Sequence, residues 1–222
     1  MSNLTVILPA RNEEESIGVV IDEIRALPVK YDILVVDNNS KDDTYNIAFY
    51  KEARVVTAEL QGKGNAMRKG FRLVNSPYVV MMNSDYTYPA AYIPYFHELL
   101  SDGYDVVVGY RRWKQGGSMS LINSFGNKAL SLLASILYGK RIRDLCTGLW
   151  AFRKEVLDEF EIKSNGFTLE AELFIEVVRH GCDLVQVPIS YRTRIGGSRA
   201  KLKVWNGFEI GWFLIKGRFT NE

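Results

Sequence analysis

The chain has little of the chemistry that marks disulfide-rich, zinc-binding or membrane-spanning proteins. Its 222 residues include only two cysteines, Cys146 and Cys182, and two histidines. Two cysteines make neither a disulfide framework nor a metal site, which fits a reducing compartment. The sequence also lacks the roughly 18 uninterrupted apolar residues of a spanning helix. We therefore expect a cytoplasmic protein, free or peripheral on the cytoplasmic face of a membrane.

An excess of charge of one sign is also missing. The chain has 28 Lys and Arg against 26 Asp and Glu, a net charge of +2. This balance argues against a general nucleic-acid-binding protein, so no nucleic-acid partner is expected. Apolar residues make up 47% and charged residues 24%, which is ordinary for a globular domain long enough to bury a sizeable core.

The first half of the chain alternates short apolar strands with amphipathic helices. Strands are predicted at 5–8, 32–36, 54–57, 78–82 and 105–109, with helices at 13–27, from a cap at Ser40 or Asp42 to 51, from about 64 to 74, and after Pro89. Repeated β-α units of this length favour a mostly parallel, doubly wound sheet. Farther on, the patterns predict helices at 121–138, 169–179 and 205–219 and strands at 149–152 and 183–188. We predict a single α/β domain, because no linker or repeat divides the chain.

The most informative segment runs from Val79 to Pro89. An apolar run typical of a buried strand ends at Asn83-Ser-Asp85, and a helix opened by Pro89 follows. Asp85 would then stand at the carboxyl end of a strand, where open α/β sheets bind their ligands. A carboxylate there suits a divalent cation, and the cation suits a diphosphate. The alternative is a solvated turn acid.

Other polar groups follow neighbouring strands and would share this edge. Pro9, Arg11 and Glu13 follow the first strand, and Asp37 ends the second. Glu13 suits the start of a helix, and Asp37 would accept bonds from a ribose or a base, or cap a turn. Gly62-Lys63-Gly64 would bring N–H groups and an ammonium to phosphate, although such a tripeptide is common in loops. Its spacing is not that of a Walker motif.

Basic residues gather in three segments of the second half, at 111–114, 140–143 and 191–203. The first follows the strand at 105–109, at the same sheet edge as Asp85. The second follows a helix, where cations also serve as terminal charges. The third holds five basic residues around a Gly-Gly-Ser turn, which favours an anion site over a solvated loop.

Taken in order, these motifs resemble family 2 glycosyltransferases of the GT-A fold, especially the dolichyl-phosphate mannose and glucose synthases. Residues 6–14 resemble the family's opening, and 35–44 resemble its Val-Asp-Asp-x-Ser-x-Asp-Gly-Thr segment. Residues 62–66 resemble its lysine-glycine loop, and 83–85 take the place of its Asp-x-Asp metal motif, with Asn83 at the first acid. Further matches at 109–111, 144–153, 166–173, 187–191 and 194–202 extend the resemblance over nearly the whole chain.

The resemblance implies a Rossmann-like nucleotide-diphospho-sugar transferase domain over residues 1–222. Residues 1–110 would bind the nucleotide sugar, GDP-mannose or UDP-glucose, and 111–222 the acceptor. The implied nucleotide-sugar residues are Pro9, Arg11, Glu13, Asp37, Lys63 and Asp85. Asp85 would also hold Mg²⁺ or Mn²⁺. The implied acceptor-phosphate residues are Arg111, Arg194, Ser198 and Lys201, and the implied catalytic residues are Asp85, Arg111 and Asp144.

The function implied in this way is transfer of a hexose, mannose or glucose, to a dolichyl or polyprenyl phosphate. The last helix agrees with a lipid acceptor, because aromatic and basic side chains together suit a membrane interface. Its apolar residues are Trp205, Phe208, Trp212, Phe213 and Ile215. Packing on the core or on a dimer partner is the alternative, and a membrane subunit is another conceivable partner.

Two other functions fit the same sequence. The first is transfer to a soluble or polysaccharide hydroxyl, with Glu170, Glu172 or Asp144 as the general base. The second is a non-catalytic nucleotide-sugar-binding subunit, because the amide of Asn83 is a weaker ligand for a hard cation than a carboxylate.

Overall fold

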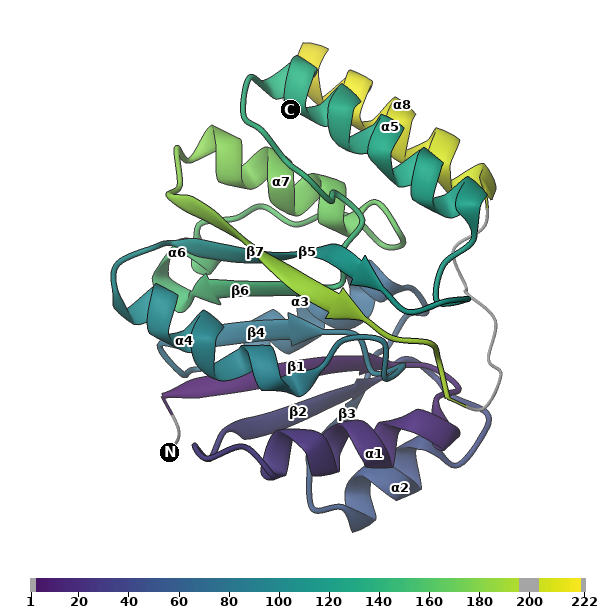
Figure 1. Ribbon diagram of the computed structural model, residues 1–222. Coiled ribbons are helices and arrows are strands. Elements are labelled where there is room, and N and C mark those ends of the chain that lie inside the picture. The colour runs from purple at the N-terminus through teal and green to yellow at the C-terminus, as the bar shows by residue number, and fades with distance from the viewer. Residues whose placement is uncertain (1–2, 196–203, 221–222) are drawn as a thin grey trace.

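The computed structural model describes residues 3–195 and 204–220, in which seven strands form one sheet between layers of helices (Figure 1). The order across the sheet is β3-β2-β1-β4-β6-β5-β7. The strands are β1 (Leu4–Ala10), β2 (Asp32–Asp37), β3 (Arg54–Thr57), β4 (Tyr78–Met82), β5 (Val106–Lys114), β6 (Leu149–Arg153) and β7 (Leu184–Tyr191). This arrangement confirms the predicted α/β class.

The sheet is mostly parallel, with one reversed strand. β1 pairs in parallel with β2 and β4, β2 with β3, and β5 with β7. β6 runs antiparallel to both β4 and β5. Because the other strands share a direction, the carboxyl ends of β1, β2 and β4 lie along one edge.

The helices cover both faces of the sheet in unequal layers. One face packs against α1 (Glu14–Arg25), α2 (Thr44–Tyr50) and α4 (Ile93–Ser101), the last preceded by the 3₁₀ turn η1 (Ala90–Tyr92). The other face packs against α3 (Lys63–Leu73), α6 (Lys154–Asp158) and α7 (Leu169–Arg179). Figure 1 shows α5 (Leu121–Tyr138) and α8 (Val204–Phe219) side by side beyond α7, as an outer layer.

Two predicted features of these elements need correction. The helix expected to begin at a Ser40 or Asp42 cap begins at Thr44. Asp42 still accepts a hydrogen bond from the Thr44 backbone N–H at 3.2 Å, whereas the Ser40 hydroxyl accepts one from Asn12 and ties two loops together. Strand β5, expected to end at 109, continues to Lys114 because its pairing with β7 extends that far, with one irregularity between Arg111 and Trp113. The expected division between residues 110 and 111 therefore falls inside a strand of the shared sheet.

Glycines near the start of α3 allow two loops to touch. A Cβ atom on Gly64 would lie 2.1 Å from the carbonyl oxygen of Ser164, and one on Gly62 would lie 2.0 Å from that of Asn165. The Asn65 N–H donates to the Asn165 carbonyl at 3.3 Å. The glycines of the 62–64 loop are thus required by the approach of the 164–165 backbone.

We predict that Gly64→Ala lowers the free energy of unfolding by about 1–3 kcal/mol, because the new methyl group collides with backbone and not with a flexible side chain. Gly116→Ala is the matched control, since nothing lies within 4 Å of its added Cβ atom. The control is expected to stay within about 0.5 kcal/mol of the parent. Urea unfolding of both variants measures the difference, and equal stability would contradict the proposed contact.

Candidate functional site

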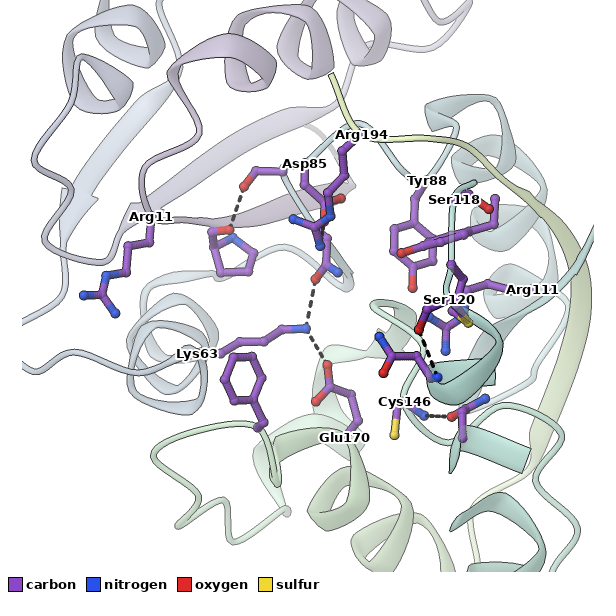
Figure 2. Close-up of a pocket in the computed structure, with 18 of the residues that line it drawn as sticks. Arg11, Lys63, Asp85, Tyr88, Arg111, Ser118, Ser120, Cys146, Glu170 and Arg194 are labelled. Carbon is purple, nitrogen blue, oxygen red and sulfur yellow. Dashed lines mark hydrogen bonds and ion pairs between the residues drawn. The ribbon is translucent and has the colours of Figure 1, made fainter. Parts of the chain in front are cut away.

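A cavity of about 860 Å³ opens at the edge where β1 and β4 end. It receives residues from the β1–α1 loop, the start of α3, the loop after β4, the start of α5 and the segment after β7. Figure 2 shows Arg11 at one end and Arg111 with Ser118 at the other, with Asp85, Lys63 and Glu170 between them. The strand-end residues therefore meet in one place, as the parallel sheet predicts.

Asp85 lies at the middle of this cavity and is nearly fully buried. One carboxylate oxygen accepts bonds from Thr87, at 2.5 Å from the hydroxyl and 3.2 Å from the backbone N–H. The other oxygen lies 2.5 Å from a guanidinium nitrogen of Arg194. The preceding residue, Ser84, donates to the Pro9 carbonyl at 2.8 Å, which ties the loop after β4 to the end of β1.

The carboxylate of Asp85 is the kind of ligand that a hard divalent cation prefers. Asp85 offers a carboxylate, and the guanidinium of Arg194 shows that a positive charge is accommodated beside it. Within residues 3–195 and 204–220, however, no group of three or more His, Cys, Asp or Glu side chains is placed to hold a metal ion. A metal at Asp85 would therefore need further oxygen ligands from a diphosphate or from water.

Asn83 faces a different partner from Asp85. Its amide oxygen accepts a bond from the Lys63 ammonium at 2.9 Å, and the same ammonium forms an ion pair with Glu170. The side chain also lies over Gly148, where an added Cβ would come within 2.5 Å of it. The position of the family's first acid is thus occupied here by a neutral group that orients a lysine.

Five of the six nucleotide-sugar residues expected from the sequence line the cavity, with Lys63 and Asp85 at its middle and the other three at one end (Figure 2). Pro9, Arg11 and Glu13 line it, together with Asn38. Asp37 is buried behind this wall. One of its carboxylate oxygens accepts the Ser40 N–H at 3.3 Å, and the other has no hydrogen-bond partner among the described residues.

The expected phosphate loop has some of its N–H groups already bonded. The Gly62 N–H donates to the Asn38 side chain at 3.1 Å, and the Asn65 N–H donates to the Asn165 carbonyl. The sequence predicted that this loop would offer backbone N–H groups to phosphate. In the structure its clearest contribution to the cavity is the ammonium of Lys63.

Arg111 and Asp144 form a buried pair at the opposite end. The Arg111 backbone N–H, Nε and Nη2 all donate to the Asp144 carboxylate, at 2.6–2.9 Å. Arg111 lines the cavity and also stacks over Tyr191 at 5.1 Å, whereas Asp144 lies behind it and accepts a bond from Asn127. Burial alone opposes both charges, but their mutual attraction holds the pKa of Asp144 below and that of Arg111 above the ordinary value.

Several cavity residues carry no clear sequence signal. Glu170 is predicted from the sequence only as one possible general base for a hydroxyl acceptor, and an acid in the first turn of a helix ordinarily just complements the helix dipole. Its pairing with Lys63 depends on the contact between the 62–64 and 164–165 loops. Cys146 also lines the cavity. Its burial, and to a smaller extent the nearby charge of Glu170, raise the pKa of its thiol to about 12, so the thiol is neutral near pH 7.

One more of the acids weighed as a general base, Glu172, does not line the cavity. Both oxygens of Glu172 accept backbone N–H groups, those of Lys163 and Ser164, so this side chain holds the 163–164 loop. Of the predicted acceptor-phosphate residues, Arg194 lines the cavity, while Ser198 and Lys201 lie outside the described residues.

The cavity continues from Arg111 to the pair of outer helices. Its lining there includes Ile122 and Leu130 of α5 and Gly207 of α8. The outward faces of both helices are strongly apolar and exposed: Leu121, Ile122, Phe125, Leu132 and Ile136 on α5, and Trp205, Phe208, Trp212, Ile215 and Phe219 on α8. We call these ten residues the α5–α8 face.

The exposure of the α5–α8 face argues against one alternative for the last helix, namely that its aromatic side packs on the core. The side of α8 that packs on the core carries Ile210 and Leu214, with Phe213 partly buried against them. The apolar residues spaced three and four apart from Trp205 to Phe219, four of them aromatic, point elsewhere and are exposed. Among the described helices, none combines the length and the apolar character needed to span a bilayer.

Comparison with known proteins agrees with this fold and these motifs. The model of the glycosyl transferase family 2 matches residues 5–160. A dolichyl-phosphate hexose transferase of Haloferax volcanii is 39% identical over 216 residues, which cover 96% of this chain and 93% of that protein. The glycosyltransferase AglJ of the same organism is 32% identical over 199 residues, covering 89% of this chain and 65% of AglJ.

A solved structure extends the comparison to three dimensions. The glucosyl-3-phosphoglycerate synthase of Mycobacterium tuberculosis, crystallised with Mn²⁺, UDP-glucose and phosphoglyceric acid, superposes with a TM-score of 0.75 at 25% identity. The superposition covers 97% of this chain and 78% of that one. Because the family model spans most of the sheet and a relative matches almost end to end, the chain belongs to glycosyl transferase family 2 and has the GT-A fold.

Proposed function

We propose that the protein transfers a hexose from a nucleotide diphosphate sugar to a dolichyl or polyprenyl phosphate. The observation that carries this proposal is the continuity between the charged cavity and the exposed α5–α8 face. An acceptor with an ionic head and a long apolar tail matches a site that is cationic inside and apolar at its mouth. The 39% identity to a dolichyl-phosphate hexose transferase supports the same acceptor.

The donor end would take GDP-mannose or UDP-glucose. Pro9, Arg11 and Glu13 would surround the base and ribose, and the unpaired oxygen of Asp37 would accept a donor from the ligand after a small adjustment. Lys63 would lie against the diphosphate or the hexose, since its ammonium is in the middle of the cavity. The related synthase crystallised with UDP-glucose supports a uridine nucleotide as one candidate.

Asp85 would hold Mg²⁺ or Mn²⁺ together with oxygens of the diphosphate. A cation bound in this way neutralises the charge that develops on the leaving nucleoside diphosphate. The Mn²⁺ in the related synthase supports this cofactor. With Asn83 turned to Lys63, Asp85 would be the carboxylate that the strand-end motif contributes.

The acceptor phosphate would attack the anomeric carbon through one of its oxygens. The bond between that carbon and the diphosphate breaks, and the nucleoside diphosphate leaves with the electron pair. A phosphate monoester is mostly dianionic at pH 7, since its second pKa is about 6, so little help from a general base is needed. Arg111 and Arg194 would align this phosphate, with Ser198 and Lys201 as further proposed contacts.

Asp144 would act through Arg111. It holds the guanidinium by three hydrogen bonds and is screened from the cavity by it, which makes it a positioning residue in this scheme. The resemblance to the family placed Asp144 among the catalytic residues, and the proposal keeps it essential while giving it no contact with substrate.

A soluble phosphorylated acceptor is the second candidate. The superposed glucosyl-3-phosphoglycerate synthase was crystallised with phosphoglyceric acid, a small soluble molecule that also carries a phosphate. The exposed apolar α5–α8 face favours the lipid, because a small hydrophilic acceptor makes no use of it.

An acceptor panel tests the proposed function. Purified protein is given UDP-glucose or GDP-mannose, Mg²⁺ or Mn²⁺, and one of three acceptors: a polyprenyl phosphate, 3-phosphoglycerate or a soluble oligosaccharide. We expect nucleoside diphosphate release and a glycosylated product with the polyprenyl phosphate. Product on 3-phosphoglycerate or the oligosaccharide alone would establish the second candidate or a hydroxyl acceptor. Donor binding without transfer to any acceptor would establish a non-catalytic subunit.

The same assay includes a matched pair of variants. Asp85→Asn keeps the size of the side chain but removes its charge, and we expect at least about a hundredfold loss of kcat, because a metal contributes several kcal/mol to such a transition state. Asp102→Asn, at the exposed end of α4, serves as the control and is expected to match the parent.

We predict that removing the charge of Asp144 damages stability and that removing both charges of the pair repairs it. Asp144→Asn leaves Arg111 buried without a counter-charge, at a cost of about 3–5 kcal/mol in the free energy of unfolding. The double variant Arg111→Met/Asp144→Asn is expected to regain most of that loss. It should remain roughly tenfold to a hundredfold low in kcat/KM for the acceptor, because a charged hydrogen bond to phosphate is gone.

Chemical unfolding and acceptor kinetics of the three proteins measure this prediction. Full recovery of both stability and kcat/KM in the double variant would show that Arg111 serves the scaffold alone. Equal instability of the single and double variants would show that the loss comes from packing and not from an uncompensated charge.

We also predict that the α5–α8 face binds anionic membranes. Phe208→Ser/Trp212→Ser should weaken partition onto vesicles containing phosphatidylglycerol at least tenfold, because each buried aromatic side chain contributes about 1.5–3 kcal/mol. Phe49→Ser/Tyr50→Ser is the control, since these aromatics are equally exposed on α2, across the sheet. Vesicle cosedimentation is the measurement. Unchanged partition with a loss of dimer in sedimentation velocity would instead assign the face to a second copy.

A further inference from the structure

The segment after β7 is held firmly against the loop that carries Asp85. The Arg192 backbone N–H donates to the Thr87 carbonyl at 2.9 Å. Its guanidinium lies 2.6 Å from Glu23 of α1 and stacks over Tyr86 at 4.7 Å. The Thr193 N–H donates to the Gln115 side chain at 3.0 Å. These contacts fix residues 192 and 193 independently of the next arginine.

Arg194 reaches from this anchored segment to Asp85. The two side chains are 19% and 5% exposed, so the ion pair is largely shielded from water. Thr87 donates to one carboxylate oxygen of Asp85, and Arg194 pairs with the other. Both oxygens of Asp85 therefore already have donors. Figure 2 shows the two side chains next to each other in the cavity.

A divalent cation and a guanidinium compete for the same oxygen. Two positive groups at one carboxylate oxygen repel each other, and either one satisfies the negative charge. Within the described ranges no cluster of three acids or histidines offers the metal another anchor. A metal at this oxygen of Asp85 is therefore disfavoured as long as Arg194 stays there.

We propose that Arg194 and the metal–diphosphate group exchange at Asp85, so that donor binding releases Arg194 to the acceptor phosphate. This inference rests on the proposed function for the identity of the two ligands. In the ligand-free protein the charge of Arg194 is neutralised by Asp85, and the acceptor phosphate finds one fewer cation. Once the donor and its metal hold Asp85, the guanidinium is free to pair with phosphate, while Arg192 keeps the backbone in place.

The exchange makes donor and acceptor binding mutually favourable and sets a donor-first order. By thermodynamic linkage, the two effects are equal in size. If the bound metal–diphosphate raises the affinity for the acceptor by some factor, the bound acceptor raises the affinity for the donor by the same factor. An enzyme built in this way has low affinity for the lipid phosphate until a sugar is ready for transfer.

Metal binding tests the exchange without any transfer reaction. Mn²⁺ is titrated into the 222-residue protein, and the concentration of free Mn²⁺ is followed by electron paramagnetic resonance. Arg194→Met keeps the length of the side chain and removes the competitor, so Mn²⁺ should bind at least about fivefold more tightly, the lower end of typical coupling between sites. Arg194→Met is also expected to bind Mn²⁺ more tightly than the parent when UDP or GDP is present. The diphosphate adds ligands to the metal, so this second titration measures Mn²⁺ affinities that are too weak to measure without it.

Two controls separate competition from bulk charge. Arg112→Met changes the net charge equally at an exposed position outside the cavity, and its Mn²⁺ affinity should match the parent within twofold. Asp85→Asn/Arg194→Met should bind Mn²⁺ no more tightly than Asp85→Asn. If Arg194→Met binds Mn²⁺ as the parent does in both titrations, or if Arg112→Met produces the same gain, the exchange is wrong.

The second half of the exchange is read from acceptor binding. Calorimetry with a short-chain polyprenyl phosphate should show at least fivefold tighter binding when UDP or GDP and Mn²⁺ are present, and Arg194→Met should remove this gain. Coupling that persists in Arg194→Met would overturn the release of Arg194 to phosphate. Tighter Mn²⁺ binding by Arg194→Met, with no transfer to any acceptor, would leave the competition standing and reject the proposed function alone.

Discussion

The need to compensate buried charge governs the cavity. Three pairs of opposite charges make up its wall: Arg194 with Asp85, Lys63 with Glu170, and Arg111 with Asp144. An isolated charge at such depth costs several kcal/mol, so each side chain is held where its partner lies. The first two pairs face the cavity with both members and the third with its cation alone. An anionic ligand therefore meets cations that already have partners, and binding is an exchange of partners.

The parallel part of the sheet brings these charges together. Asp85 and the 9–13 segment follow the strands β4 and β1, which pair side by side, and their loops are joined by the bond from Ser84 to Pro9. The long strand β5 runs in the same direction as β4, because β6 is antiparallel to both, and it carries Arg111 to another part of the same edge. Arg194 follows β7, the neighbour of β5, and returns to the β4 loop. One sheet thus supplies both ends of the cavity.

The sequence predicted most of this sheet because its strands are continuous apolar runs. Strands β3 and β4 occur at the predicted residues, 54–57 and 78–82. Strand β5 was predicted too short, since residues 110–114 are polar and aromatic and are held in the strand only by pairing with β7. The direction of β6 was not predictable, because an apolar run has the same pattern in either direction.

The candidate site was predictable where it follows strand ends and unpredictable where it depends on contacts between distant loops. Asp85, Lys63 and Arg111 were expected at one edge, and all three line the cavity. Glu170 has no strand-end position, and its pairing with Lys63 arises only because Gly62 and Gly64 admit the 164–165 backbone. A local motif records which side chains are available, whereas the packing of loops decides which of them meet.

The outer helices α5 and α8 place an exposed apolar surface next to the charged cavity. α5 and α8 pack on each other and on α7, with Ala134, Ile210 and Leu214 fully buried and residues such as Leu133 and Phe213 packed partly against the core, whereas the α5–α8 face lies outside it. A monomer that served only soluble ligands would gain from polar residues there. The aromatic stripe of α8, from Trp205 to Phe219, lies beyond the end of the cavity that Gly207 lines. The proposed amphiphilic acceptor would account for both features, since its tail would follow the α5–α8 face while its phosphate would replace Asp85 as the partner of Arg194.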